Sequence, residues 1–586
     1  MLASVQGILF CPAIATCELR MKRNTRVPIG GCYMEPAVCG NLIRQHMPGV
    51  AFGTGQPKQW QLWGCAPTNN YTLVFADTIR RGMGVITGNF IPIMAGDFDR
   101  DGLPDLVGRN YEWTDTTTQD FWNVIAVQEC PTPAEPPVKL AWFSRLNRLC
   151  AEDATARYVR AFDGDSLTEI VLVTEQGVDG KGLVVYELCS DDSAVLVWGA
   201  EHRHSVTSAV GDFDLDGRYE AVTCDYDTVR TVECLGDNRY QAPSWLDRTP
   251  YTNGVDVFAG GDVDQNGKSE FYVNYVRYMG ISWRHYLYGW EATGDNVYQQ
   301  FFVDSANGGA GTRSTCGDLD GDGVDELVYS AGGTVLVYKG TSPHEFEDVF
   351  RCPTLGAEAC AVYDMNRNGY NELVVTYQLT DIYEVEAARV LSPNSGVLRP
   401  GDTCRVSWQT FDPPRCDSIS LFLRRDSTWL LDTIVTGLAP ADTPYCWVVP
   451  NIRADSCRLV AIAYGPGWQY DESDSALRIP GGGIGEELPR AAYSFRLNVL
   501  PNPVRSRTSV AYEITRSGPV TLAAYDQTGR QVALLASGVH DRGRYRRDWR
   551  CDDSQGRRLR AGVYFLRLET PEGRRSQKVV VNWETR

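Results

Sequence analysis

Long hydrophobic runs are absent from this chain of 586 residues. No stretch reaches the ~18 to 20 consecutive apolar residues that a membrane-spanning helix requires. The apolar run within residues 1–20 is short and has no basic residue before it, so it makes a poor export signal. The sequence therefore predicts no membrane span.

Positive charge is also scarce. Lys and Arg number 56 against 74 Asp and Glu, which gives a formal net charge of -18. A field of this sign repels nucleic acid and anionic membrane surfaces and attracts cations. The Arg-rich run at 542–551 falls on expected strands, where it reads as a solvated face. We expect no nucleic-acid partner, and metal cations are the first partners to consider.

Motifs of catalysis are missing as well. The chain contains neither a GxSxG elbow nor a Gly-rich phosphate loop. Its six histidines form no recognisable zinc or triad motif; they are His46, His202, His204, His285, His344 and His540. No catalytic residue is assigned, and a protein that is not an enzyme is expected.

The 18 cysteines include no CxxC pair and no Cys/His cluster of zinc-ligand spacing. Dispersed cysteines in this number favour an oxidising compartment. The close pairs Cys224/Cys234 and Cys352/Cys360 are candidates to staple hairpins, with buried free thiols as the alternative.

Gly (56), Tyr (29) and Trp (15) are abundant, and these residues favour turns and β-strands. The length also exceeds the ~100 to 200 residues of one ordinary domain. We predict an all-β protein of several domains.

One acidic phrase recurs along the chain. CGDLDGDGVDELVY, from Cys316, is echoed from Ala95, Val210, Gly260 and Val362, and a degraded copy, AFDGDSLTEIVLV, starts at Ala161. The first loop positions are 97, 161, 212, 262, 318 and 364, with steps of 64, 51, 50, 56 and 46 residues. A nearly constant step indicates one supersecondary unit per copy.

The spacing within each copy is that of a calcium loop. Acidic or amide residues stand at positions one, three and five, Gly usually at six, and Asp or Glu at nine. Alternate side chains on a curled backbone point oxygens inward, Gly supplies the positive φ, and position seven offers its backbone carbonyl. Hard oxygen ligands in this number suit Ca²⁺ better than the smaller Mg²⁺.

The candidate metal ligands fall in five loops. They are Asp97, Asp99, Asp101, Leu103 and Asp105; Asp212, Asp214, Asp216, Arg218 and Glu220; Asp262, Asp264, Asn266, Lys268 and Glu270; Asp318, Asp320, Asp322, Val324 and Glu326; and Asp364, Asn366, Asn368, Tyr370 and Glu372. Affinity should follow carboxylate number, so the loops at 97, 212 and 318 should bind most tightly and the loop at 364 most weakly. Four or five Ca²⁺ sites are expected.

The degraded copy has Ala161 at position one and Ser166 in place of the glycine, so Asp163, Asp165 and Glu169 are expected to form a metal-free turn. A solvated Asx-turn is also the ordinary explanation of any single DxDG. Recurrence argues against it elsewhere, because clustered carboxylates repel by ~1 kcal/mol per pair in water, and by more when partly buried.

Each loop is followed by short apolar strands, and about four such strands per repeat make a propeller blade. These residues resemble the FG-GAP repeat of integrin α-subunits and bacterial VCBS proteins, whose calcium loops lie between strands of propeller blades. The resemblance implies a β-propeller over residues 51–386, with about seven blades and six or eight as alternatives. The first blade would contain WQLWGC and YTLVFADT without a loop of its own, and residues 1–50 have no assigned role.

Two β-sandwiches are expected after the propeller. Residues 387–479 alternate apolar positions with Pro and Gly and look like an immunoglobulin-like module, and residues 480–494 read as a linker. Residues 495–586 resemble the C-terminal sorting domain of the type IX secretion system, which is similar to the flagellar hook-capping immunoglobulin-like module. The matching segments are Pro501-Asn502-Pro503, Tyr525-Asp526, Gly529-Arg530, Gly562-Val563-Tyr564-Phe565 and Lys578-Val579-Val580-Val581.

The resemblance implies delivery by the secretion machinery, so a secreted or cell-surface protein is expected. The first hypothesis is a monomeric, calcium-stiffened platform for an extracellular carbohydrate, protein or matrix ligand. The alternative is a propeller-fold hydrolase or lyase of extracellular polysaccharide. Paired carboxylates also serve glycosidases, but a catalytic pair needs two unlike environments, and these loops repeat in equivalent ones.

Overall fold

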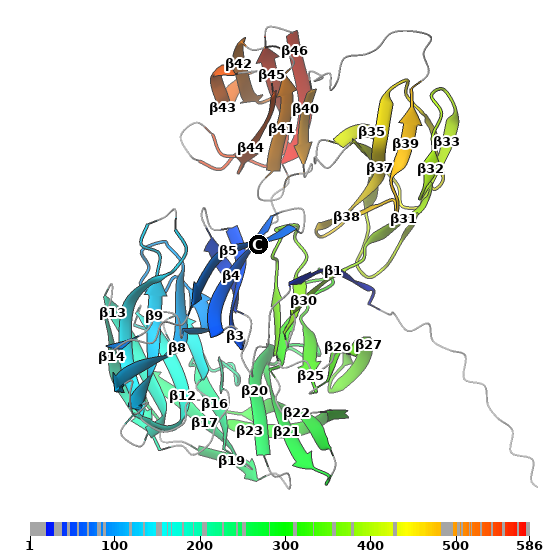
Figure 1. Cartoon of the computed structure of the whole chain (residues 1–586). Coiled ribbons are helices and arrows are strands. Elements are labelled where there is room, and N and C mark those ends of the chain that lie inside the picture. Colours follow the sequence, from blue (N-terminus) through cyan, green and yellow to red (C-terminus); the bar gives the residue numbers. More distant parts are fainter. Residues whose placement is uncertain are drawn as a thin grey trace, which may run out of the picture. The chain divides into compact units, whose positions relative to one another are not determined.

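A computed structural model describes residues 19–581 of this chain, with gaps at 28–37, 44–46, 56–57, 67–69, 79–83, 86–89, 116–119, 133–134, 148–154, 161, 166, 179–180, 191–192, 202–207, 226–227, 242–243, 249–252, 281, 309–312, 332, 354–358, 377–379, 426–430, 482–495, 501–503, 505–507, 515, 517, 528–529, 541–542, 554–556 and 571–572. Every regular element in the described part is a strand (Figure 1). The prediction of an all-β protein is confirmed. Within the same residues, no helix has the length and apolar character needed to cross a membrane.

The chain divides into two compact units, residues 1–387 with 411–415 and residues 388–410 with 416–586. The first unit contains seven antiparallel sheets, here numbered 1 to 7. Each is built on a meander in which consecutive strands pair. This order follows from the short connections between consecutive strands.

Sheets 1 to 4 follow one another along the chain. Sheet 1 contains β2 (Val38–Ile43), β3 (Met47–Gly55), β4 (Lys58–Ala66) and β5 (Asn70–Thr78). Sheet 2 contains β7 (Ile91–Gly96), β8 (Asp105–Asp115), β9 (Asp120–Glu129) and β10 (Lys139–Asn147), with β6 (Gly84–Val85) also beside β8. Sheet 3 contains β11 (Thr155–Arg160), β12 (Thr168–Val178), β13 (Lys181–Ser190) and β14 (Ser193–Ala200). Sheet 4 contains β15 (Ser208–Gly211), β16 (Glu220–Asp225), β17 (Thr228–Gly236), β18 (Arg239–Tyr240) and β19 (Ser244–Arg248).

Sheets 5 to 7 complete the first unit. Sheet 5 contains β20 (Asn253–Gly261), β21 (Glu270–Tyr278), β22 (Trp283–Gly294) and β23 (Val297–Gly308). Sheet 6 contains β24 (Thr315–Gly317), β25 (Glu326–Ser330), β26 (Thr334–Ser342) and β27 (Glu345–Pro353). Sheet 7 contains β28 (Ala359–Tyr363), β29 (Glu372–Thr376), β30 (Thr380–Val385) and, from the start of the chain, β1 (Met21–Val27).

Sheet 7 is completed by a strand distant in sequence. β1 pairs antiparallel with β30, with Met21 opposite Val385 and Val27 opposite Thr380 (Figure 1). Arg26 donates to Asp381 through Nε (2.6 Å) and Nη2 (2.7 Å), which is a two-pronged ion pair across the two strands. Residues before 51, to which the sequence assigns no role, thus supply β1, β2 and part of β3.

The first strands of the sheets contact one another in cyclic order. β2 contacts β7, and the series continues through β11, β15, β20, β24 and β28, which returns to β2. Seven separate hydrophobic clusters each lie between two neighbouring sheets. The cluster between sheets 4 and 5, for example, contains Phe213, Val222, Phe271, Tyr275 and Trp290, all buried. The hydrophobic core of this unit is therefore divided among the interfaces between neighbouring sheets.

The second unit begins with two sheets. One contains β31 (Ala388–Ser392), β33 (Thr403–Thr410) and β36 (Tyr445–Val448). The other contains β32 (Gly396–Val397), β34 (Ser418–Arg425), β35 (Leu431–Leu438), β37 (Arg453–Tyr464), β38 (Trp468–Glu472) and β39 (Leu477–Pro480). β31 of the first sheet contacts β37 and β38 of the second, as the two layers of a sandwich would.

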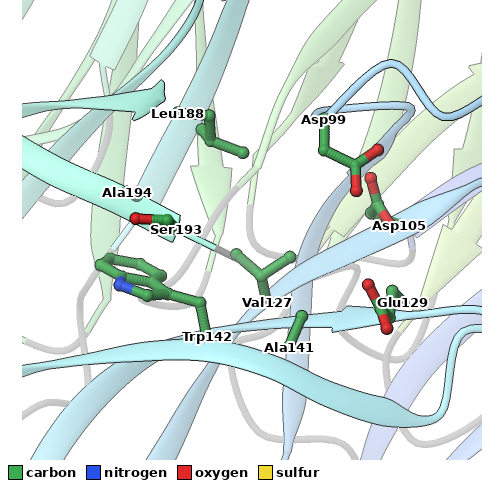
Figure 2. Close-up of a pocket in the computed structure, with 9 residues that line it drawn as sticks. All are labelled: Asp99, Asp105, Val127, Glu129, Ala141, Trp142, Leu188, Ser193 and Ala194. Carbon is green, nitrogen blue, oxygen red and sulfur yellow. The ribbon is translucent and has the colours of Figure 1, made fainter. Parts of the chain in front are cut away.

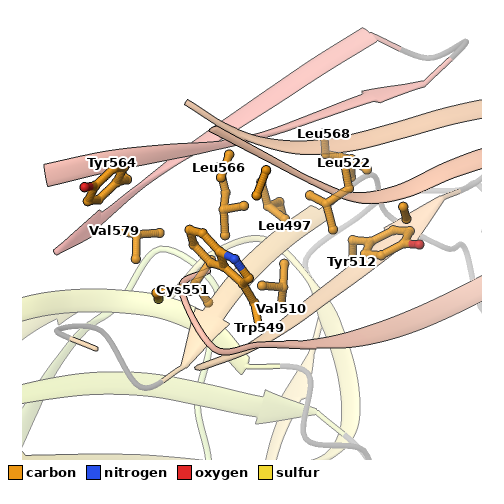
Figure 3. Close-up of a cluster of buried hydrophobic side chains, with 14 of the residues drawn as sticks. Leu497, Val510, Tyr512, Leu522, Trp549, Cys551, Tyr564, Leu566, Leu568 and Val579 are labelled. Carbon is orange, nitrogen blue, oxygen red and sulfur yellow. The ribbon is translucent and has the colours of Figure 1, made fainter. Parts of the chain in front are cut away.

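Two further sheets follow residue 495. They contain β40 (Arg496–Leu500), β41 (Thr508–Ile514) and β44 (Gly543–Trp549), and β42 (Gly518–Tyr525), β43 (Gln531–His540), β45 (Gly562–Thr570) and β46 (Gly573–Val581). Both sheets contribute to one hydrophobic cluster, in which Tyr512, Trp549, Leu566 and Val579 are buried (Figure 3). Of the segments that resemble a sorting domain, Gly562–Phe565 and Lys578–Val581 lie on the paired strands β45 and β46. Pro501-Asn502-Pro503 and Gly529 lie outside the described residues.

None of the fourteen cysteines in the described part of the chain forms a disulfide. Cys224 and Cys234 lie on neighbouring strands, but Cys224 faces Val229, and Cys234 follows Glu233, which faces Glu220 at the other end of β16. The register thus separates the two thiols, and the hairpin staple expected there does not form. Both side chains are instead buried in the apolar interfaces of sheet 4.

Candidate metal centres in the acidic loops

Six acidic loops occupy the same connection, between the first and second strands of sheets 2 to 7. Every candidate ligand residue lies in its expected loop. The last acid of each loop, at position nine, is the first or second residue of the second strand. Because the sheets share one topology and contact in cyclic order, the loops occupy equivalent places around the unit.

The backbone of each full copy is curled as its glycine predicts. The glycine at position six has positive φ in all five, namely Gly102, Gly217, Gly267, Gly323 and Gly369. Its N–H donates to the carboxylate at position one, at 3.0 Å from Gly217 to Asp212 and 2.9 Å from Gly323 to Asp318. This bond fixes the first carboxylate over the loop.

The acid at position nine is buried in every copy. One of its oxygens accepts the backbone N–H of position two, as in Phe213 N to Glu220 Oε2 (2.8 Å) and Val263 N to Glu270 Oε2 (3.0 Å). Burial raises the pKa of five of these acids to about 8; they are Asp105, Glu169, Glu220, Glu270 and Glu326. Nearby loop acids raise the pKa further, whereas the hydrogen bond from the backbone lowers it. Burial also raises the pKa of Glu372 well above its usual range. The negative form of each acid therefore lacks the stabilisation that water or a cation would provide.

The second oxygen of four closing acids has no hydrogen-bond partner. These atoms are Oε1 of Glu169, Glu220, Glu270 and Glu326, and in the loop at 212 the buried Oδ1 of Asp212 is also without one. A buried, unpaired carboxylate oxygen is costly. In the loop at 212, atoms of Asp212, Asp214, Asp216 and Glu220 lie within 4.8 Å of one another. That donor set fits a hard cation.

A second acid, which the loop spacing does not reveal, faces the closing acid from the third strand. Glu169 pairs in register with Glu187, Glu220 with Glu233, and Glu270 with Glu291. Each side chain is largely buried. A charged residue within the apolar strands VVYELC, TVECLG and GWEATG is the sequence signal that could have identified them.

Most of these third-strand acids have a positive or amide partner. Arg218 Nη1 lies 2.7 Å from Glu233 Oε1, Lys268 bonds Glu291, and Lys139 bonds Glu129. In sheet 7, Glu384 accepts hydrogen bonds from amide groups of Asn24 (2.8 Å), Asn366 (3.1 Å) and Asn368. Arg218 and Lys268, the residues at position seven, thus neutralise the acids of the third strand. Their side chains donate hydrogen bonds to these acids, which lie outside the loop.

Sheet 6 differs because its third strand carries Lys339 at the corresponding place. The Lys339 Nζ lies 2.5 Å from Asp320 Oδ2, 2.6 Å from Asp322 Oδ2 and 3.4 Å from Glu326 Oε1. Both oxygens of Asp318 accept backbone N–H groups, from Gly321 and Gly323. The loop at 318, with four carboxylates, therefore already contains a cation of the protein's own.

The loop at 364 is satisfied differently. Asn366 Nδ2 donates to Glu372 Oε1, the oxygen that is without a hydrogen bond in sheets 3 to 6. The two oxygens of Asp364 accept the N–H groups of Asn368 (3.0 Å) and Gly369 (3.1 Å). With amides at positions three and five, this loop needs a cation least.

Hairpin tips tie three of the loops, those at 161, 212 and 262, to the next sheet. Asn296, between β22 and β23, donates its N–H to Asp214 Oδ2 (2.7 Å) and its Nδ2 to Glu233 Oε2 (2.6 Å). Asn238 makes the same two bonds to Asp163 and Glu187 of sheet 3. His344 makes them to Asp264 and Glu291 of sheet 5, where its Nε2 lies 3.0 Å from Glu291 Oε2. All three tip residues have positive φ. The acidic loops therefore lie at the junctions between sheets.

In sheet 2 the loop borders a small hollow (Figure 2). Asp99, Asp105 and Glu129 present carboxylates on one side, and Trp142 and Leu188 line the apolar side. The carboxylates come from the loop, the second strand and the third strand, which repeats the arrangement of the other sheets.

Comparisons with known proteins give no family for the chain: no family model and no curated protein matches it. Among solved structures, the biofilm matrix protein Bap1 of V. cholerae is 9% identical, with 63% of this chain and 91% of that chain covered and a TM-score of 0.35. An Agrocybe aegerita lectin that recognises non-reducing terminal N-acetylglucosamine is 13% identical, with 60% and 86% covered and a TM-score of 0.31. PorZ, a surface component of the type IX secretion system of Porphyromonas gingivalis, is 11% identical, with 93% and 75% covered and a TM-score of 0.21. At such TM-scores these likenesses carry no conclusion about this chain.

Proposed function

We propose that this protein is an exported, cell-surface binding protein whose first unit is a calcium-stiffened, seven-bladed β-propeller. The blades are sheets 1 to 7, and β1 closes the ring by completing the last one. The cyclic contacts of the first strands and the seven interfaces between neighbouring sheets support this architecture.

The observation that carries the calcium assignment is the loop at 212. It combines four carboxylates, a glycine-dependent curl and two buried oxygens without partners, Asp212 Oδ1 and Glu220 Oε1. Ca²⁺ would supply the missing partner to both oxygens. The loops at 97 and 262 share the curl and the buried closing acid, and complete this group of proposed sites.

Calcium would act on this platform mechanically. Asp214 holds the tip of sheet 5 through Asn296, and Asp264 holds the tip of sheet 6 through His344. A cation that fixes these carboxylates also fixes the junction between two blades. The acidic residues would thereby serve rigidity and leave recognition to other loops of the ring.

A binding role is favoured over catalysis by the equivalence of the closing acids. In sheets 3 to 6 the closing acid has the same burial, the same backbone donor and the same raised pKa of about 8. An acid and base pair would need two acids whose pKa values are driven apart. The proposed ligands are an extracellular carbohydrate, protein or matrix component.

An array of glycans and matrix proteins, probed with the full chain in Ca²⁺ and in EGTA, tests this function. We expect calcium-dependent retention on one ligand class and no new reducing ends after prolonged incubation with that ligand. Release of oligosaccharide products would overturn the binding role and establish the polysaccharide hydrolase or lyase instead.

The C-terminal sandwich, 495–586, is proposed to direct secretion and surface display. The resemblance of Gly562–Phe565 and Lys578–Val581 to a sorting domain supports this role, as does its separate hydrophobic core. A chain truncated after Arg490 should accumulate inside the cell while keeping a folded propeller. Surface display of the truncated chain at the level of the full chain would contradict the role.

A further inference from the structure

Sheet 3 contains a cluster of four carboxylates where the sequence predicts a metal-free turn. One ligand atom from each of Asp163, Asp165, Glu169 and Glu187 lies within 4.8 Å of the others. Asp163, Glu169 and Glu187 are 6%, 0% and 7% exposed, so three of the four charges are withdrawn from water. Such a group repels itself strongly unless something positive joins it.

A buried atom in this cluster lacks a partner. Glu169 Oε2 accepts the N–H of Phe162, whereas Oε1 of the same fully buried carboxylate has no hydrogen bond. Burying such an oxygen is unfavourable unless a donor or a cation completes it. This is an observation independent of the clustering, and it points to a ligand.

The positive charge found in neighbouring sheets is missing here. Position seven is Arg218 in sheet 4 and Lys268 in sheet 5, and each neutralises its third-strand acid. In sheet 3 position seven is Leu167. Among the residues that the structure describes, none forms an ion pair with the four carboxylates of sheet 3. Glu187 accepts only from Asn238 Nδ2 (2.9 Å) and, weakly, from the Cys189 thiol.

We propose that Asp163, Asp165, Glu169 and Glu187 form a divalent-cation site, with Ca²⁺ as the fitting ion. Position one of the loop motif is Ala161, so the fourth carboxylate comes from the third strand instead. Hard carboxylate oxygens in this number match Ca²⁺, which accepts irregular coordination. The site lies outside the loops assigned calcium above and does not depend on them.

The tip of sheet 4 helps to build the site. Asn238 donates its N–H to Asp163 Oδ2 (2.8 Å) and its amide to Glu187 Oε2 (2.9 Å), which holds a loop carboxylate and a strand carboxylate together. The cation would thus bind at the junction of sheets 3 and 4.

Two full-length variants test the site: Glu187→Gln and Asp165→Asn. The control is Glu201→Gln, which neutralises an exposed acid of the same region. Calorimetric titration of chelator-treated protein with Ca²⁺ should give one site fewer in each test variant than in the wild type and the control. In EGTA, both test variants should melt above the wild type, because one repelling charge is gone.

If the wild-type chain binds Ca²⁺ and both variants bind as many ions as the wild type, this inference is wrong while the proposed function stands. Absence of calcium binding by the wild-type chain would overturn it together with the proposed function. Asp165 is only partly buried, so its variant remains informative if Glu187→Gln fails to fold.

Discussion

The charge at residue 339 decides whether an acidic loop needs a metal. If carboxylate number alone set the affinity for Ca²⁺, the loops at 318 and 212 would bind equally tightly, because each has four carboxylates. In the structure, Lys339 lies within 3.4 Å of three of the acids at 318, whereas Glu233 occupies the corresponding place at 212 and binds Arg218. We therefore expect the loop at 318 to bind calcium weakly in the wild-type chain.

Lys339→Gln should convert this loop into a metal-dependent one. In EGTA the variant should lose about 2 kcal/mol of unfolding free energy, because removing one partner of a largely buried ion pair leaves its acids uncompensated. Saturating Ca²⁺ should restore it, since a ligand at about 100 times its Kd stabilises by ~2.7 kcal/mol. Urea unfolding with and without Ca²⁺ measures both, and Lys339→Arg, which keeps the charge, is the control. Equal losses in Ca²⁺ and EGTA would contradict this assignment.

At the scale of elements, the hairpin tips are the features that join one sheet to the next. Asn238, Asn296 and His344 each contact two acids of the preceding sheet and adopt positive φ. Sheet 7 has no such tip, because its fourth strand is β1 from the start of the chain. The sheet that precedes it is the one in which Lys339 occurs.

Two substitutions of Asn296 separate its roles. Asn296→Gly keeps the backbone conformation and the N–H donated to Asp214 but removes the amide bond to Glu233, and should cost about 1 kcal/mol. Asn296→Ala should cost about 1 kcal/mol more, because Ala disfavours positive φ. Chemical unfolding of the two variants checks the order. A Gly variant less stable than the Ala variant would show that the tip does not bind as described.

The elements differ in how far the sequence predicts them. Each loop is contiguous within nine residues, so its ligand spacing and its glycine could be identified directly. The third-strand acids stand out in the sequence only as charged residues within apolar strands. Their contact with the loops could not be predicted, nor could that of Lys339 and the tips, because strand register and sheet contacts bring these residues to the loops. β1 could not be placed either, since its pairing with β30 joins residues at the two ends of the unit. Glu187 also reaches its loop only through strand register, because it faces Glu169 from the third strand. The contiguous sequence of the degraded copy therefore predicts a metal-free turn.

At the scale of the whole molecule, we expect rigidity to be a consequence of ion binding. Among the described residues of the first unit, seven hydrophobic clusters lie between neighbouring sheets. Buried acids at the junctions weaken these interfaces unless a cation compensates them. Calcium should therefore stabilise the unit as a whole rather than one loop.

Thermal unfolding of the full chain in EGTA and in millimolar Ca²⁺ tests this claim most directly. Several sites, each contributing ~2.7 kcal/mol at about 100 times its Kd, should raise the Tm of the first unit by roughly 10 °C. Mg²⁺ at the same concentration should raise it less, because the loops are too irregular for an octahedral ion. We predict this calcium-specific rise in Tm, and superimposable melting curves in Ca²⁺ and EGTA would contradict a calcium-stiffened first unit.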